Sequence, residues 1–114
     1  MSKIALLVDD EASNIDLLRS LLPDDIKVKA ATSGALALRI ATKSMPDIIF
    51  MDVLMPELSG PETCTKLREL PGGEQVNIIY ISGSELAEDI KNENGFIQKP
   101  LNQQKLMNIL SEFL

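Results

Sequence analysis

Short apolar segments recur along this chain at intervals that leave room for a helix between each pair. Five of them have the length and composition of buried strands, and they cover residues 3–8, 26–31, 48–52, 76–81 and 96–98. In the second segment apolar residues alternate with lysines, which indicates a strand at a sheet edge. The third runs unbroken into Asp52 and is closed by Pro56, so it carries an acidic side chain to the carboxyl end of a buried strand.

Apolar residues at helical spacing predict five helices after these strands, over residues 13–22, 33–43, 59–70, 84–91 and 102–113. We expect the first helix to pack through four leucines: Leu17, Leu18, Leu21 and Leu22. Ser33 and Asn102 stand where a helix N-cap is needed, and Ser59 with Glu62 has the spacing of a capping box. The fourth helix is short, acidic and poor in apolar residues, so it is the weakest of the five.

Strands that alternate with helix-length segments imply parallel pairing, right-handed crossovers and helices on both faces of the sheet. The predicted fold class is therefore α/β, with three layers. No repeat, linker or low-complexity tract divides the 114 residues, so we expect one domain over residues 1–114.

Composition excludes several kinds of chemistry. The chain contains no histidine and a single cysteine, Cys64, so a histidine triad, a histidine-rich metal site and an internal disulfide are all excluded. A net charge of -6 argues against direct binding to a nucleic-acid backbone. The apolar runs have strand length, far below what a bilayer span needs, and residues 1–11 do not have the form of a secretory signal. We expect a cytoplasmic protein that does not bind membranes.

Polar side chains come directly after the predicted strands. Asp9 and Asp10 follow the first strand, Asp52 ends the third, Ser82 follows the fourth and Lys99 follows the fifth. The carboxyl ends of parallel strands share one edge of the sheet, so three carboxylates should meet there and repel one another unless a cation neutralises them. Mg²⁺ suits such oxygen ligands, while a hydroxyl and an ammonium group can hold a phosphoryl group. The pattern predicts a magnesium-dependent phosphoryl site.

Four motifs in order give the chain a resemblance to the receiver domains of bacterial two-component response regulators. The motifs are Val8 to Glu11, Met51 to Pro56 with Gly60, Ile81 to Gly83, and Phe96 to Pro100. Each motif alone is weak evidence, but the four together span the chain. The resemblance, closest in kind to the chemotaxis regulators, implies a doubly wound, flavodoxin-like sheet with strand order 2-1-3-4-5.

The same resemblance implies which residues bind metal and phosphate. Asp52 would be the phospho-acceptor, taking a phosphoryl group from a phosphohistidine. Asp10, Asp52 and the main-chain carbonyl of Leu54 would hold Mg²⁺, with Asp9 acting through a bound water. An apolar Leu54 two residues after the acceptor gives an attacking water no hydrogen bond, which implies a long-lived phosphate.

On the other strands, the resemblance implies that Ser82 and Lys99 hold the phosphoryl oxygens. Phe96 matches an aromatic switch position, where the ring moves inward as the Ser82 hydroxyl is drawn to the phosphate. The Lys99–Pro100 bond is expected to be cis, which would direct the lysine at the site. Simpler readings stay open at this point: the first acidic pair or Ser82 as helix caps, and Phe96 as ordinary core packing.

The implied partners are a sensor histidine kinase or a histidine phosphotransfer protein upstream and a protein target downstream. The signal would leave by protein contact, from either a stand-alone receiver or a piece of a larger regulator or hybrid kinase. The segment between Ser82 and Lys99 is more than one helical turn shorter than is usual in receivers, so we expect a shortened fourth helix.

Two other functions remain as alternatives. One is a degenerate receiver that docks a partner without being phosphorylated. The other is a phosphatase that forms an aspartyl phosphate, although the spacing of the acids after the first strand does not fit that class. We expect no enzyme activity beyond the chain's own phosphotransfer and slow dephosphorylation.

Overall fold

The computed structural model describes residues 3–83 and 95–114 and contains one five-stranded parallel sheet. Its strands lie in the order β2-β1-β3-β4-β5, as predicted. Their bounds are β1 Ile4–Val8, β2 Lys27–Ala31, β3 Ile48–Asp52, β4 Asn77–Ser82 and β5 Gly95–Gln98. The described helices are α1 Ala12–Leu21, α2 Gly34–Lys43, α3 Gly60–Arg68 and α5 Gln103–Phe113.

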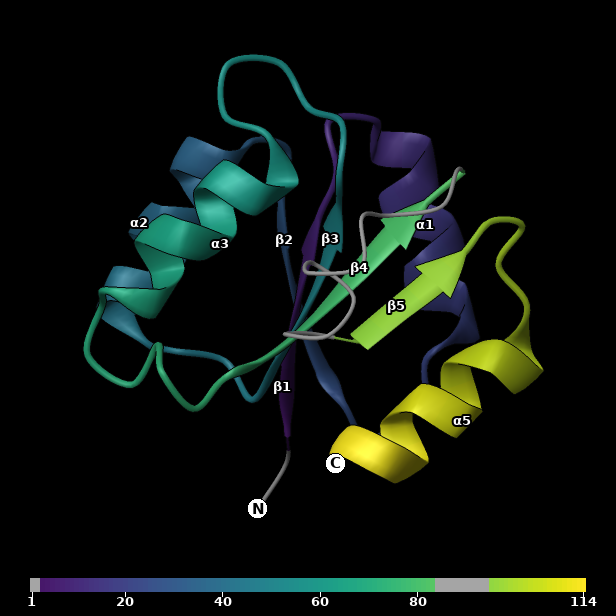
Figure 1. Ribbon diagram of the computed structural model, residues 1–114. Coiled ribbons are helices and arrows are strands. Elements are labelled where there is room, and N and C mark those ends of the chain that lie inside the picture. The colour runs from purple at the N-terminus through teal and green to yellow at the C-terminus, as the bar shows by residue number, and fades with distance from the viewer. Residues whose placement is uncertain (1–2, 84–94) are drawn as a thin grey trace.

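Helices cover both faces of the sheet, which gives the three predicted layers. Figure 1 shows α2 and α3 on one side and α1 and α5 on the other. Each face has its own apolar core. Leu7 and Phe50 belong to the cluster that includes residues of α1 and α5, whereas Leu6 and Ile49 belong to the cluster that includes residues of α2 and α3. Alternate side chains of β1 and β3 are thus buried on opposite faces, which explains why these strands are apolar without interruption.

The edge strand and the helix caps agree with the sequence predictions. β2 is an edge strand, and Lys27 and Lys29 are exposed. The Ser33 hydroxyl accepts from the backbone N–H of Leu36, and the Asn102 side chain accepts from that of Lys105. At Ser59 both hydrogen bonds of the capping box are present. These caps fix where three helices begin, and with them the loops that leave the sheet.

Two predictions about helices need correction. Leu17 does not face the core: its side chain is 49% exposed, because α1 turns Ile15 and Leu18 toward the sheet instead. The third helix ends at Arg68 rather than Leu70. The predicted fourth helix over residues 84–91 lies outside the described residues. None of the helices in the described part of the chain has the length and apolar character that crossing a membrane requires.

Candidate functional site

Three carboxylates meet at the carboxyl ends of β1 and β3. The two strands are neighbours in a register that pairs Val8 with Met51, so the residues that follow them come to the same point on the sheet edge. One carboxylate oxygen from each of Asp9, Asp10 and Asp52 lies within 4.8 Å of the others. The structure therefore brings together the acidic residues that the sequence singled out.

Asp9 is the most buried of the three acids, at 8% exposure. Its Oδ1 accepts a hydrogen bond of 2.9 Å from the backbone N–H of Glu11, and the side chain of Asn14 lines the same pocket as Asp9. Burial raises the pKa of Asp9, and the hydrogen bonds and the positive charge of Lys99 only partly oppose this. The position of Asn14 was not predicted, since an asparagine in the first turn of a helix has no sequence signature of its own.

Asp52 is partly exposed at the end of β3. Its pKa is raised, first by burial and then by the negative charge of Asp9, while Lys99 acts in the opposite direction. Two carboxylates with raised pKa values and mutual repulsion favour a bound cation, because a cation removes the cost of holding both charges in one place. The donor set of carboxylate oxygens suits a hard divalent ion.

Ser82 and Lys99 reach the same edge from β4 and β5. Ser82 ends β4 with 4% exposure, and its carbonyl accepts a hydrogen bond of 2.8 Å from the backbone N–H of Lys99. Lys99 lines the same pocket as Asp9, and its positive charge lowers the pKa of both Asp9 and Asp52. The Lys99–Pro100 bond is cis, the geometry that the resemblance implies.

The loop after Asp52 packs closely against the start of α3. The backbone N–H of Gly60 donates a 2.8 Å hydrogen bond to the carbonyl of Val53, and a Cβ at Gly60 would lie 2.5 Å from the Asp52 carbonyl oxygen. Leu54 projects into solvent, with 76% of its surface exposed. The metal-binding role of its main-chain carbonyl stays a prediction.

Phe96 lies on β5, and β4 separates it from Asp52 at the end of β3. It pairs with Tyr80 in the register of β4 and β5, and its partly buried side chain packs against the core on the α2 and α3 side. This position fits both core packing and a movable ring, so the switching role also stays a prediction.

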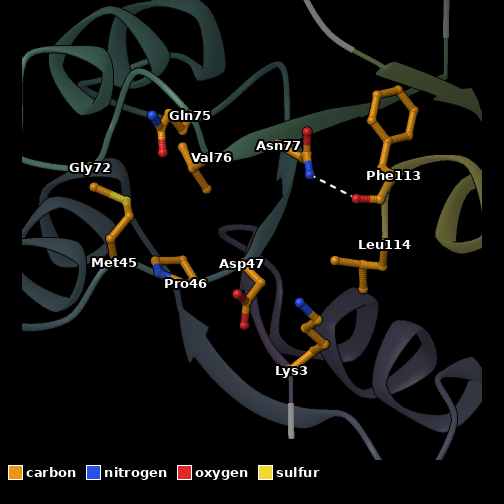
Figure 2. Close-up of a pocket in the computed structure, with 10 residues that line it drawn as sticks. All are labelled: Lys3, Met45, Pro46, Asp47, Gly72, Gln75, Val76, Asn77, Phe113 and Leu114. Carbon is orange, nitrogen blue, oxygen red and sulfur yellow. Dashed lines mark hydrogen bonds between the residues drawn. The ribbon is translucent and has the colours of Figure 1, made fainter. Parts of the chain in front are cut away.

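A pocket of about 320 Å³ opens beside the acidic cluster, and a second of about 330 Å³ lies at the opposite edge of the sheet. Asp9, Asn14, Leu17 and Lys99 are among the residues that line the first. Figure 2 shows the second, where the Asn77 side chain donates a 2.8 Å hydrogen bond to the carbonyl of Phe113. None of the predicted site residues lines this second pocket, whereas Asp9 and Lys99 line the first.

Comparison with known proteins identifies the family. The family model described as "Response regulator receiver domain" matches residues 5–111. The response regulator PleD of Caulobacter vibrioides is 31% identical, in a match that covers 93% of this chain and 25% of PleD. The chain therefore belongs to the response regulator receiver domain family, as the resemblance predicted.

Two solved structures show the same fold from end to end. Chemotaxis protein CheY4 of Vibrio cholerae matches with a TM-score of 0.90 and 28% identity over 100% of both chains. The receiver domain of a sensor histidine kinase from Pseudomonas aeruginosa PAO1 matches with a TM-score of 0.87 and 27% identity, covering 99% of this chain and 98% of that one. That receiver was solved with a magnesium ion coordinated in its active site cleft.

The relatives differ greatly in length. This chain spans 19% and 25% of two of the curated proteins that it matches, but 98% of a third. Receivers thus occur as parts of much longer proteins and as nearly the whole of short ones. What is common to the relatives is the receiver of a two-component system.

Proposed function

We propose that this chain is the phospho-acceptor of a two-component phosphorelay and that Asp52 is its acceptor residue. A carboxylate oxygen of Asp52 attacks the phosphorus of a phosphohistidine on a sensor histidine kinase or a histidine phosphotransfer protein. The new P–O bond forms as the P–N bond breaks, which leaves an acyl phosphate on Asp52 and returns the electron pair to the imidazole.

One observation carries this proposal: three carboxylates lie together at one sheet edge, and Lys99 lines the pocket beside them together with Asp9. A lone solvated acid in a loop would not be grouped with two other carboxylates in this way. The receiver fold places the group at the ends of central strands, where open parallel sheets bind ligands.

The residues present fit a magnesium ion. Each Mg–O bond is about 2.1 Å, so two oxygens on one ion lie at most about 4.2 Å apart. The three carboxylate oxygens lie within 4.8 Å of one another. This spacing would allow Asp10 and Asp52 to bind the ion directly, with a water between Asp9 and the ion. The main-chain carbonyl of Leu54 would complete the protein ligands. Bound Mg²⁺ would offset the negative charge that develops during phosphoryl transfer.

Ser82 and Lys99 would hold the phosphoryl group after transfer. Phosphorylation adds about -1.5 to -2 charges and three acceptor oxygens to Asp52, and charge-assisted bonds from the hydroxyl and the ammonium group would favour one conformation of the domain. Reversing a two-state equilibrium completely needs about 5.5 kcal/mol of differential binding. Inward movement of Phe96, as Ser82 is drawn to the phosphate, would carry the change to the surface.

The output of this switch would be a changed contact with a downstream protein, in the cytoplasm and without direct binding to nucleic acid or membranes. The chain would catalyse only its own phosphotransfer and slow dephosphorylation.

Beryllofluoride, which mimics an aspartyl phosphate, tests the proposal directly. With Mg²⁺ present, beryllofluoride should shift the amide spectrum of the wild-type protein and leave Asp52→Asn unchanged. Absence of any response in the wild type would instead favour a docking module that is not phosphorylated. Steady hydrolysis of unrelated phosphomonoesters would favour a phosphatase.

A further inference from the structure

Lys105 contacts the backbone on both sides of Lys99. It lies in the first turn of α5, and its Nζ donates one hydrogen bond of 3.2 Å to the carbonyl of Gln98 and another of 3.1 Å to the carbonyl of Pro100. One ammonium group therefore ties together the residue before Lys99 and the residue after it. Nothing in the sequence signalled this, because the contact depends on how the loop turns between β5 and α5.

The charge of Lys105 is unfavourable for its own helix. The first turn of a helix prefers acidic side chains, because the backbone N–H groups there carry partial positive charge. The first turn of α5 contains no acid. A lysine at this position is thus explained by the two carbonyl oxygens that it binds rather than by the stability of α5. Local preferences of this kind are most often overridden near functional sites.

A third hydrogen bond, besides the two from Lys105, holds this backbone: the N–H of Lys99 donates to the carbonyl of Ser82. That bond fixes Lys99 to β4, while Lys105 fixes the carbonyls that flank it. We propose that Lys105 is a positioning residue for the phosphoryl transfer, acting through Lys99. This inference rests on the proposed function, since it concerns the aim of the Lys99 ammonium group at the acidic cluster.

Loss of the Lys105 ammonium group would free the carbonyls of Gln98 and Pro100 to bind water. The loop would still close, because Asn102 continues to cap α5. The Lys99 side chain would then sample a wider range of positions around Asp52. Phosphoryl transfer depends on positioning and electrostatics, so the rate should fall while the three carboxylates stay in place.

The test compares Lys105→Met and Lys105→Arg with Lys43→Met, which removes an exposed lysine at the end of α2. Intact mass follows the phosphorylation of Asp52 by acetyl phosphate and Mg²⁺. Lys105→Met should be slower by about three- to tenfold, a modest share of what misplacement of a catalytic group can cost. Lys105→Arg, which keeps the donors, should recover most of the rate, and Lys43→Met should match the wild type.

A double-mutant cycle separates positioning from general stability. In a Lys99→Met background, Lys105→Met should cause no further loss of rate. The Mg²⁺ affinity of both variants should stay within about twofold of the wild-type affinity, because Lys99 is not a metal ligand. An equal loss in both backgrounds, or a wild-type rate for Lys105→Met, would overturn the proposal.

Hydrogen exchange distinguishes the failure of this inference from failure of the proposed function. If the wild type is not phosphorylated, the proposed function fails on that measurement alone. Exchange at the Lys99 amide does not depend on phosphorylation and should be faster in Lys105→Met than in Lys43→Met. Equal exchange in these two variants would refute the positioning role of Lys105 whatever the phosphorylation result.

Discussion

Replacing Gly60 with alanine should move the end of β3, and Asp52 with it, away from the first turn of α3. The added Cβ would lie 2.5 Å from the carbonyl oxygen of Asp52 and 3.0 Å from the Cα of Val53. Both are backbone atoms, so no flexible side chain can give way. The first distance is about 0.9 Å short of the 3.4 Å at which ordinary contact begins, and the two segments must separate by a comparable amount.

This displacement has two separate costs. Forcing an extra methyl group into a packed site destabilises a protein by about 1–3 kcal/mol, which lowers the melting temperature by roughly 4 °C or more per kcal/mol for a domain of this size. The hydrogen bond from Gly60 to Val53 is stretched as well. A misplacement of about 1 Å at a reacting group costs up to about a hundredfold in rate, so phosphorylation of Asp52 should slow by about ten- to a hundredfold.

Gly73→Ala is the matched control, because a Cβ there would overlap the carbonyl oxygen of Leu67. Gly73 lies just before β4, at the edge of the sheet opposite the acids. This variant should lose at least as much stability but phosphorylate at a near-normal rate, measured by intact mass with acetyl phosphate at a temperature where both variants are folded. Gly83→Ala, which meets no atom within 4 Å, should change stability by less than about 0.5 kcal/mol. A normal rate in Gly60→Ala, or an equal loss in Gly73→Ala, would refute the reasoning.

Three other variants test separate parts of the structure. In metal-free buffer, Asp52→Asn should raise the free energy of unfolding at pH 7 by about 0.5–1 kcal/mol. Because the pKa of Asp52 is raised in the folded state, the folded wild type binds more protons than the unfolded chain and loses stability as the pH rises from 3.8, the unfolded pKa, through the folded pKa. Denaturant unfolding should show that the gain from Asp52→Asn vanishes below that pH range. Glu57→Asn should stabilise the folded protein by about 0.5 kcal/mol, since asparagine tolerates the left-handed backbone at φ 67 better than glutamate does. Thermal unfolding measures this, with Glu112→Asn in α5 as the control that should destabilise the protein. Leu54→Asn should shorten the lifetime of the phosphate by about three- to tenfold, because an exposed amide can orient water where the exposed leucine cannot, and an unchanged decay of phosphorylated protein would contradict the role given to Leu54.

Much of this fold could be predicted because local signals and the global arrangement agree. The unbroken apolar run of residues 48–52 predicted a central strand, and burial of its side chains on both faces explains the pattern. Ser33, Ser59 and Asn102 marked helix starts because their side chains bond to backbone N–H groups only three residues away. The acidic cluster followed from one rule, that parallel strands end at the same edge.

What could not be predicted depends on contacts between elements. Leu17 and Leu18 are equally apolar, and only the way α1 lies on the sheet decides that Leu18 is buried and Leu17 exposed. The hydrogen bonds of Lys105 to the β5–α5 loop and the position of Asn14 beside Asp9 likewise involve residues whose types have no special meaning alone. The sequence does not predict the left-handed backbone at Glu57, because glycine or asparagine is the usual residue in that conformation.

The acceptor role of Asp52 can be measured by intact mass after incubation with acetyl phosphate. In the presence of Mg²⁺, the wild-type protein should gain the mass of one phosphoryl group, which hydroxylamine should remove as expected for an acyl phosphate. Chelation of Mg²⁺ should abolish the gain, and Asp52→Asn should show none. A wild-type protein that stays unmodified, or an Asp52→Asn variant that gains the same mass at the same rate, would contradict the account.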